Sequence, residues 1–215
     1  RICYASCSRC PFGTSEHSSE CALRGCQHFT STPVRRATSR VFTSRIEAIT
    51  GWDGRIMKLL IVGGAGYIGS HCVLESLRAG HEVVVLDDLR TGHREAIGDV
   101  DLVEGSLHQP NVLRSVFETH QIDAVFNLAA SCSVPESVHN PGLYYHNNLA
   151  GTLNLVAAMV EAGVTRLVHS STAAVYGDPE EVPIPEDHRM QPVNPYGDSK
   201  RLVECTLTEM SKAHH

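Results

Sequence analysis

Short apolar runs alternate with longer segments of helical periodicity from residue 57 onward. The apolar runs lie at 58–62, 82–86, 101–103, 124–129 and 166–170, and helical patterns lie at 67–79, 111–119, 143–162 and from 195 to the end. Such alternation is typical of a parallel sheet with helices on both faces. The pattern therefore predicts an α/β fold with a doubly wound parallel sheet over residues 57–215.

Residues 1–56 differ from the rest of the chain. They hold eight arginines, no lysine, four acidic residues and fourteen serines or threonines, without apolar periodicity. The first methionine is Met57, just before the first apolar run. We therefore expect residues 1–56 to be a disordered or non-native extension, such as upstream sequence translated as though it were protein.

Two functional alternatives remain for this extension. An arginine-rich, serine-rich and acid-poor composition also describes a transit peptide. A zinc site is the other alternative, although there is no second C-x-x-C pair and the spacings match no regular zinc motif. Its ligands would come from Cys7, Cys10, Cys21, Cys26 and His28.

Charge and hydropathy exclude several classes of protein. Residues 1–56 carry +4 (eight arginines less four acids), so the remainder carries −10 within a total of −6. An acidic domain does not suggest nucleic-acid binding. No run of about eighteen apolar residues suggests a membrane span, and no segment resembles a secretory signal. We expect a cytoplasmic protein in which Cys72, Cys132 and Cys205 are reduced thiols.

A glycine-rich run follows the first apolar run and opens the first helix. It reads Gly63-Gly64-Ala65-Gly66-Tyr67-Ile68-Gly69. In a strand–turn–helix context, Gly63 permits the tight turn, Gly66 lets the backbone approach a pyrophosphate, and Gly69 allows close packing of helix on strand. The run therefore predicts a dinucleotide cradle.

The second predicted strand leads into Asp87 and Asp88, and Asp87 lies eighteen residues past Gly69. A carboxylate at this point accepts hydrogen bonds from the adenosine ribose hydroxyls, although Asp87 could simply cap the strand end. The two carboxylates would repel a 2′-phosphate. The sequence therefore favours NAD over NADP.

Tyr196 and Lys200 stand four residues apart in the last helical segment. This spacing places both side chains on one helix face, where an ammonium lowers the pKa of a phenol and makes it a usable base. With the glycine run, the pair predicts one site that holds a nicotinamide cofactor and a proton-transferring tyrosine.

From Met57 to Met210 the chain resembles the extended short-chain dehydrogenases/reductases of the NAD-dependent epimerase/dehydratase family. Within that family it is most similar to the UDP-glucose 4-epimerases. The resemblance is carried by the blocks at 63–70, 136–138, 144–152, 170–177 and 195–200.

The resemblance implies an isomerase that uses NAD to epimerise C4 of a nucleotide sugar through a transient 4-keto sugar, as in UDP-glucose/UDP-galactose interconversion. It assigns Tyr196 as the base, Lys200 to the nicotinamide ribose and to tuning Tyr196, and Thr172 to the reacting sugar hydroxyl. The full-length protein would be a homodimer. Further cofactor contacts are implied for Tyr67, Ile68, Leu89, Thr91, Gly92, Ser106, Leu107, Leu128, Ala129, Ala130 and Asn148.

Ala173 and Ala174 separate the chain from neighbouring activities. Similar 4,6-dehydratases carry an acidic pair here, and uronate decarboxylases keep a glutamate at the second position. Three positions depart from the family pattern: Val62 replaces a threonine, Ser106 an aspartate that contacts adenine, and Cys132 a lysine near the cofactor.

The family continues beyond the position of His215 with further strands and a small substrate domain. We therefore expect this chain to be a C-terminally truncated fragment that does not turn over a sugar nucleotide. Two alternatives stay open: a catalytically silent NAD-binding module, or another nucleotide-sugar epimerase of the family.

Overall fold

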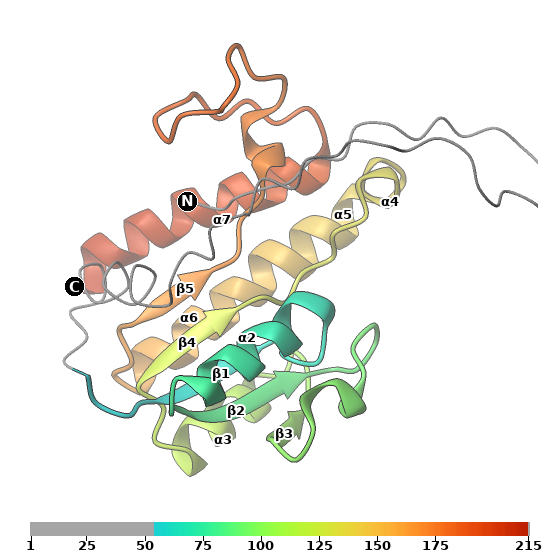
Figure 1. Ribbon diagram of the computed structural model, residues 1–215. Helices are drawn as coiled ribbons and strands as arrows, with labels where there is room; N and C mark the ends of the chain where they lie inside the picture. Colours follow the sequence, from blue (N-terminus) through green and yellow to red (C-terminus); the bar gives the residue numbers. More distant parts are fainter. Residues whose placement is uncertain (1–53, 215) are drawn as a thin grey trace, which may run out of the picture. The chain divides into compact units, whose positions relative to one another are not determined.

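The computed structural model describes residues 54–214, which form a five-stranded sheet in which every neighbouring pair of strands is parallel. The strand order is β3-β2-β1-β4-β5 (Figure 1). The chain runs outward from β1 to β3 on one side, then returns to place β4 on the other side of β1. The strands are β1 (Lys58–Val62), β2 (Glu82–Asp87), β3 (Asp101–Glu104), β4 (Ala124–Asn127) and β5 (Leu167–His169).

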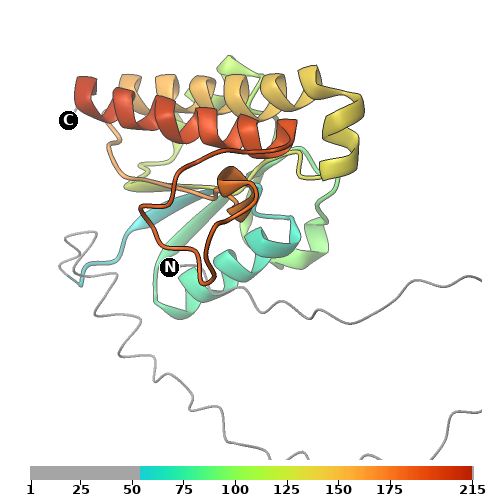
Figure 2. The same cartoon turned by 90° about the horizontal axis from the view of Figure 1, so that it is seen from above.

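Helices cover both faces of this sheet. Helix α2 lies on one face, while α6 and α7 lie side by side on the other (Figure 2). The helical elements are α2 (Tyr67–Arg78), η1 (Arg94–Ile97), α3 (Pro110–Thr119), α4 (Val134–His139), α5 (Pro141–Tyr144), the π-helix η2 (Tyr145–Ala150), α6 (Gly151–Glu161), η3 (Ala173–Tyr176) and α7 (Pro195–His214).

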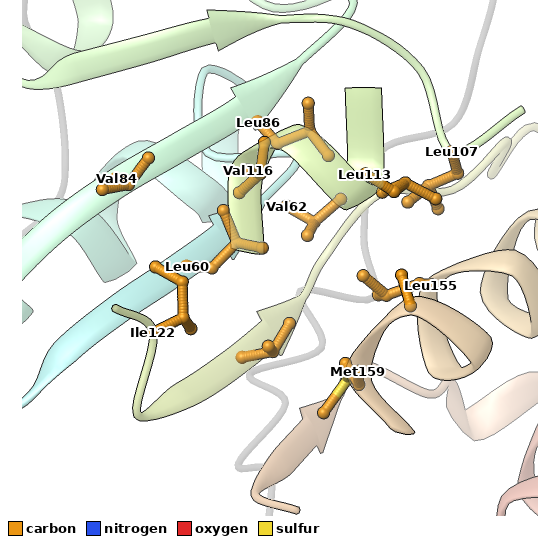
Figure 3. Close-up of a cluster of buried hydrophobic side chains, with 12 residues drawn as sticks. Leu60, Val62, Val84, Leu86, Leu107, Leu113, Val116, Ile122, Leu155 and Met159 are labelled. Atoms are coloured by element: carbon orange, nitrogen blue, oxygen red, sulfur yellow. The ribbon is translucent and has the colours of Figure 1, made fainter. Parts of the chain in front are cut away.

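Alternate residues of the strands supply two hydrophobic cores, as the pleat of a sheet requires. On one face, Leu60 of β1, Leu113 of α3 and Leu155 of α6 belong to one cluster (Figure 3). Val125 of β4 belongs to the same cluster. On the other face, Ile61 and its neighbours pack against α2 and η1. Because both faces are buried, the strands read as continuous apolar runs in the sequence.

The predicted α/β fold is confirmed, with strand bounds within two residues of those expected. The helix expected at 143–162 is found as α5, η2 and α6, so its middle is a π-helix. Helix α4 and the two 3₁₀ turns η1 and η3 were not expected from the sequence pattern. No helix within residues 54–214 is long and apolar enough to cross a membrane. The possible zinc ligands between Cys7 and His28 lie outside the described residues, as does most of the predicted 1–56 extension.

Candidate active site

A cleft opens at the carboxyl ends of the strands, beside the neighbouring strands β1 and β4, where the strand order reverses. This topological switch point is where doubly wound folds bind ligands. The cleft has a volume of about 400 Å³. Its lining consists of Val62, Gly63, Gly66, Tyr67, Ile68, Gly69, Leu86, Asp87, Asp88, Arg90, Thr91, Gly105, Ser106, Leu107, Leu128, Ala129, Ala130, Cys132, Asn147, Ser170, Tyr196 and Lys200.

The floor of the cleft is the glycine loop between β1 and α2. Gly63 has a φ of +77°, and a Cβ atom there would stand 2.7 Å from the backbone nitrogen of Ala129. A Cβ atom on Gly69 would stand 2.0 Å from the carbonyl oxygen of Gly63. Only glycine therefore allows α2 to start this close to the ends of β1 and β4.

The start of α2 is suited to an anion. Gly66 is the N-cap residue, no side chain caps the helix, and its first turn holds no acidic residue. The first backbone N–H groups of a helix lack intrahelical partners and favour negative charge. A pyrophosphate therefore fits this end of the cleft, with the glycine loop as its cradle.

Asp87 ends β2 and is only 8% exposed. Its Oδ2 atom accepts a hydrogen bond from the backbone nitrogen of Ala65 at 2.9 Å, and its Oδ1 atom accepts one from that of Leu89 at 2.9 Å. One carboxylate thus ties the glycine loop to the segment that follows β2. Asp88 is exposed, and its Oδ1 atom accepts a hydrogen bond from the backbone nitrogen of Arg90 at 3.1 Å.

Tyr196 and Lys200 reach the same cleft from the first turns of α7. Lys200 is 2% exposed, and its Nζ atom donates to the carbonyl oxygen of Ser170 at 2.8 Å. Burial lowers the pKa of Lys200 to about 8, against the smaller opposing effects of Cys132 and Glu204. The ammonium therefore still carries its charge near neutral pH, inside a largely desolvated site.

Close packing fixes the start of α7. A Cβ atom on Gly197 would stand 2.5 Å from the carbonyl oxygen of Ala174, so α7 lies directly against η3. The Asn194 side chain accepts a hydrogen bond from the backbone nitrogen of Gly197 at 2.8 Å. The ring of Tyr144, fully buried, meets that of Tyr196 edge-on with 6.3 Å between centroids. The start of α7 is thus held by η3 and by the Asn194 side chain, and the Tyr196 ring packs against Tyr144 of α5.

The buried Asn148 of η2 joins three segments. Its Nδ2 atom donates to the Ser131 carbonyl and to the Ser199 hydroxyl, each at 3.0 Å, and its Oδ1 atom accepts from the Ser131 backbone nitrogen at 2.8 Å. Ser199 in turn donates to the carbonyl oxygen of Tyr196 at 2.8 Å. Asn148 therefore couples the segment after β4 to the turn of α7 that carries the tyrosine.

The structure places most of the expected site residues in one cleft, but four of them do not line it. Thr172 caps η3 through its own side chain, and Asn148 accepts a hydrogen bond from the side chain of the cleft-lining Asn147. Leu89 and Gly92 shape the segment after β2, where a Cβ atom on Gly92 would stand 2.9 Å from Ala65. The roles expected for all of these residues, inside the cleft and outside it, stay predictions.

Several lining residues were missed as contacts, namely Leu86, Arg90, Gly105, Asn147 and Ser170, while Val62 and Cys132 had been noted only as departures from the family pattern. Leu86 and Gly105 lie at the ends of β2 and β3, so the expected strand ends were a signal for their place in the cleft. No periodicity marks Arg90, because its place depends on the path of the loop after β2.

The comparisons with known proteins agree with this geometry. The model of the NAD dependent epimerase/dehydratase family matches residues 59–215. The chain is similar to the UDP-glucose 4-epimerase of Azospirillum brasilense, with 49% identity over 158 residues that cover 73% of this chain and 45% of that protein. The corresponding protein of Lactobacillus helveticus is 44% identical, with 73% and 48% covered.

Solved structures give the same result. The UDP-glucose 4-epimerase of Brucella ovis in complex with NAD matches with a TM-score of 0.72 and 39% identity, covering 74% of this chain and 49% of that one. The chain spans about half the length of the curated relatives it matches. On the family match over residues 59–215 and the likeness to these epimerases, the chain belongs to the NAD dependent epimerase/dehydratase family.

Proposed function

We propose that the whole protein is an isomerase that uses NAD to epimerise C4 of a nucleotide sugar, interconverting UDP-glucose and UDP-galactose. The observation that carries this proposal is the meeting of Tyr196 and Lys200 with the glycine loop in one cleft. Relatives named UDP-glucose 4-epimerase support the choice of reaction.

The cleft fits a dinucleotide on the evidence of its own atoms. The glycine loop leaves no room for a Cβ atom at Gly63 or Gly69, and the uncapped start of α2 offers N–H groups to a pyrophosphate. Asp88 and Thr91 would then face the adenosine half, while Tyr196 and Lys200 would hold the nicotinamide half. When bound, the nicotinamide ring would take up hydride from the sugar carbon and return it.

The residues of this chain would supply the proton chemistry. Tyr196 would accept the proton of the 4-hydroxyl as the 4-keto sugar forms, and would return it after the sugar turns over in the site. Lys200 would stabilise the phenolate, because its buried ammonium is held at a fixed place by the Ser170 carbonyl. Thr172 would hold the reacting oxygen without adding charge.

The η3 turn argues against elimination chemistry at this site. Ala173 and Ala174 follow Thr172 directly, and Gly197 packs against Ala174 without room for a Cβ atom. Neither alanine can donate or accept a proton. A dehydration of the sugar would need an additional acid and base, so we propose redox at C4 alone.

The direct test uses the whole protein and this 215-residue chain side by side. Each would be incubated with NAD and UDP-galactose, and UDP-glucose would be followed by chromatography. Turnover by the whole protein supports the proposal, and NAD binding without turnover would favour a silent NAD-binding module. Conversion of another nucleotide sugar alone would show a different epimerase of the family. We expect no turnover by the 215-residue chain.

We further propose that the whole protein is a cytoplasmic homodimer that serves galactose metabolism. The support for a dimer is a shallow apolar groove between α6 and α7. Leu153, which lines this groove, is 39% exposed, and so is Val160 on the same helix. The groove is lined by Leu149, Thr152, Leu153, Val156, Val203, Thr206, Leu207 and Met210.

A further inference from the structure

Glu204 lies on α7 one helical turn after Lys200, and its carboxylate reaches the segment between β5 and η3. Its Oε1 atom accepts a hydrogen bond from the hydroxyl of Ser171. The Glu204 side chain is half-buried and follows the buried Val203. A hydrogen bond to an ionised carboxylate is stronger than one to a neutral acceptor, so Glu204 holds Ser171 firmly.

Lys200 holds the same segment one residue earlier. Its Nζ atom donates to the carbonyl oxygen of Ser170 at 2.8 Å. Residues four apart on a helix share a face, so Lys200 and Glu204 bind two consecutive residues from the same side of α7. Thr172 comes next in the chain after Ser171. The place of the Thr172 hydroxyl therefore depends on both contacts from α7.

The charges around Lys200 act on its protonation. Burial lowers the pKa of Lys200 to about 8, while the charges of Cys132 and Glu204 raise it. Cys132 faces Lys200 from the segment after β4, His169 faces it from β5, and Tyr196 shares its helix and its cleft. His169 is neutral near pH 7, because its pKa is lowered to about 3, so it adds no charge there. The Glu204 carboxylate therefore favours the ammonium where burial opposes it.

We propose that Glu204 is a positioning residue with two effects on the site. Through the Ser171 hydroxyl it fixes the segment that carries Thr172. Through its negative charge it keeps Lys200 in the ammonium form that would stabilise a phenolate on Tyr196. The inference rests on the proposed function for the roles of Thr172 and Tyr196, whereas the effect of Glu204 on Lys200 is a property of the folded chain alone.

Two variants separate these effects. Glu204→Gln removes the charge but keeps a side-chain oxygen that can accept the hydrogen bond from Ser171. Ser171→Ala removes the hydrogen bond but keeps the charge. Glu118→Gln is the matched control, because it makes the same substitution as the first variant at an exposed position of α3.

The charge effect is measured by NMR titration of the lysine side chain in the 215-residue chain. The chain holds three lysines, so a background with Lys58→Arg and Lys212→Arg leaves Lys200 as the source of the one labelled lysine signal. We expect Glu204→Gln to move the midpoint of the Lys200 titration to lower pH. The other two variants should leave the midpoint in place, because both keep the carboxylate next to Lys200.

The positioning effect is measured by turnover of UDP-galactose in the whole protein across pH. Glu204→Gln should move the alkaline limb of the pH profile to lower pH, because a neutral amine does not stabilise a phenolate. Ser171→Ala should lower turnover on the order of tenfold at every pH, because a displaced Thr172 orients the sugar less well. Glu118→Gln should leave the profile unchanged.

The outcomes that overturn the inference differ for its two parts. An unchanged Lys200 midpoint in Glu204→Gln would overturn the charge effect, and wild-type turnover of Ser171→Ala would overturn the positioning of Thr172. A whole protein that epimerises no nucleotide sugar would overturn the proposed function. In that case the NMR titration of the 215-residue chain would still decide whether Glu204 acts on Lys200.

Discussion

His169 is the clearest example of a single residue that the fold holds in an unfavourable state. Both of its ring nitrogens are buried and have no hydrogen-bond partner in residues 54–214. Burial, with a smaller effect of Lys200, lowers the pKa of His169 to about 3. The folded protein therefore keeps the ring neutral where an unfolded chain would protonate it.

This difference predicts acid sensitivity of stability. Below pH 6.5, the ordinary pKa of histidine, the unfolded state binds a proton that the folded state does not bind until about pH 3. For each unit by which the pH falls between these values, this group should lower the free energy of unfolding by roughly 1.4 kcal/mol. Urea unfolding at several pH values should show a shallower acid slope for His169→Leu than for wild type. Equal slopes would contradict the account, and the exposed His214→Leu serves as the control.

Some features of single residues could be expected from the sequence, and others could not. Tyr196 and Lys200 line one cleft with the glycine loop, and their spacing on a helix and the glycine run were both visible in the sequence. Their roles stay predictions. The two backbone hydrogen bonds of Asp87 were not predictable, because they depend on how two loops distant in sequence meet. In the sequence, a carboxylate that binds a ligand at a strand end cannot be told from one that holds a loop.

Among the elements, the glycine loop restricts most strictly which residue types can occupy its positions. A Cβ atom on Gly69 would lie 2.0 Å from the Gly63 carbonyl oxygen and 2.7 Å from the Gly64 Cα atom, and both of these are rigid backbone. Helix α2 would have to move away from β1. The cradle for a pyrophosphate would open as a result.

We therefore expect Gly69→Ala to lower the free energy of unfolding by about 1–3 kcal/mol, a typical cost of overpacking, and to abolish NAD binding. Gly142→Ala is a matched control, because a Cβ atom there meets nothing within 4 Å. It should leave stability unchanged or raise it by up to about 1 kcal/mol. Urea unfolding and NAD titration of both variants measure these effects. Wild-type behaviour of Gly69→Ala would refute this view of the loop.

The π-helix η2 shows why helix existence was predictable and helix geometry was not. Apolar residues from 143 to 162 fit a helical period, and that stretch is helical. One wider turn leaves the period almost unchanged, so the pattern carries no sign of it. Asn148 lies in this wider turn and hydrogen-bonds to Ser131 and Ser199. The six-residue α4 was missed because it is too short to show periodicity.

At the scale of the whole molecule, the groove between α6 and α7 bears on assembly. If two whole proteins associate through this groove, a charge in it should separate them, because the buried carboxylate would have no partner. Leu153→Glu should therefore yield a monomer in light scattering of the whole protein. Leu77→Glu, which adds the same charge at an exposed position of α2, should not. A dimer in the Leu153→Glu variant would exclude this groove as the interface.

The central claim is that Tyr196 is the base in a cleft that binds NAD. Its most direct test is Tyr196→Phe in the whole protein, with epimerisation measured from UDP-galactose and NAD affinity measured by calorimetry. Loss of a general base should cut turnover on the order of a hundred- to ten-thousand-fold. The affinity for NAD should stay within about threefold of wild type, because the aromatic ring that packs against Tyr144 remains. Tyr176→Phe, outside the cleft, should leave both quantities unchanged. Turnover of Tyr196→Phe within about tenfold of wild type would contradict the account.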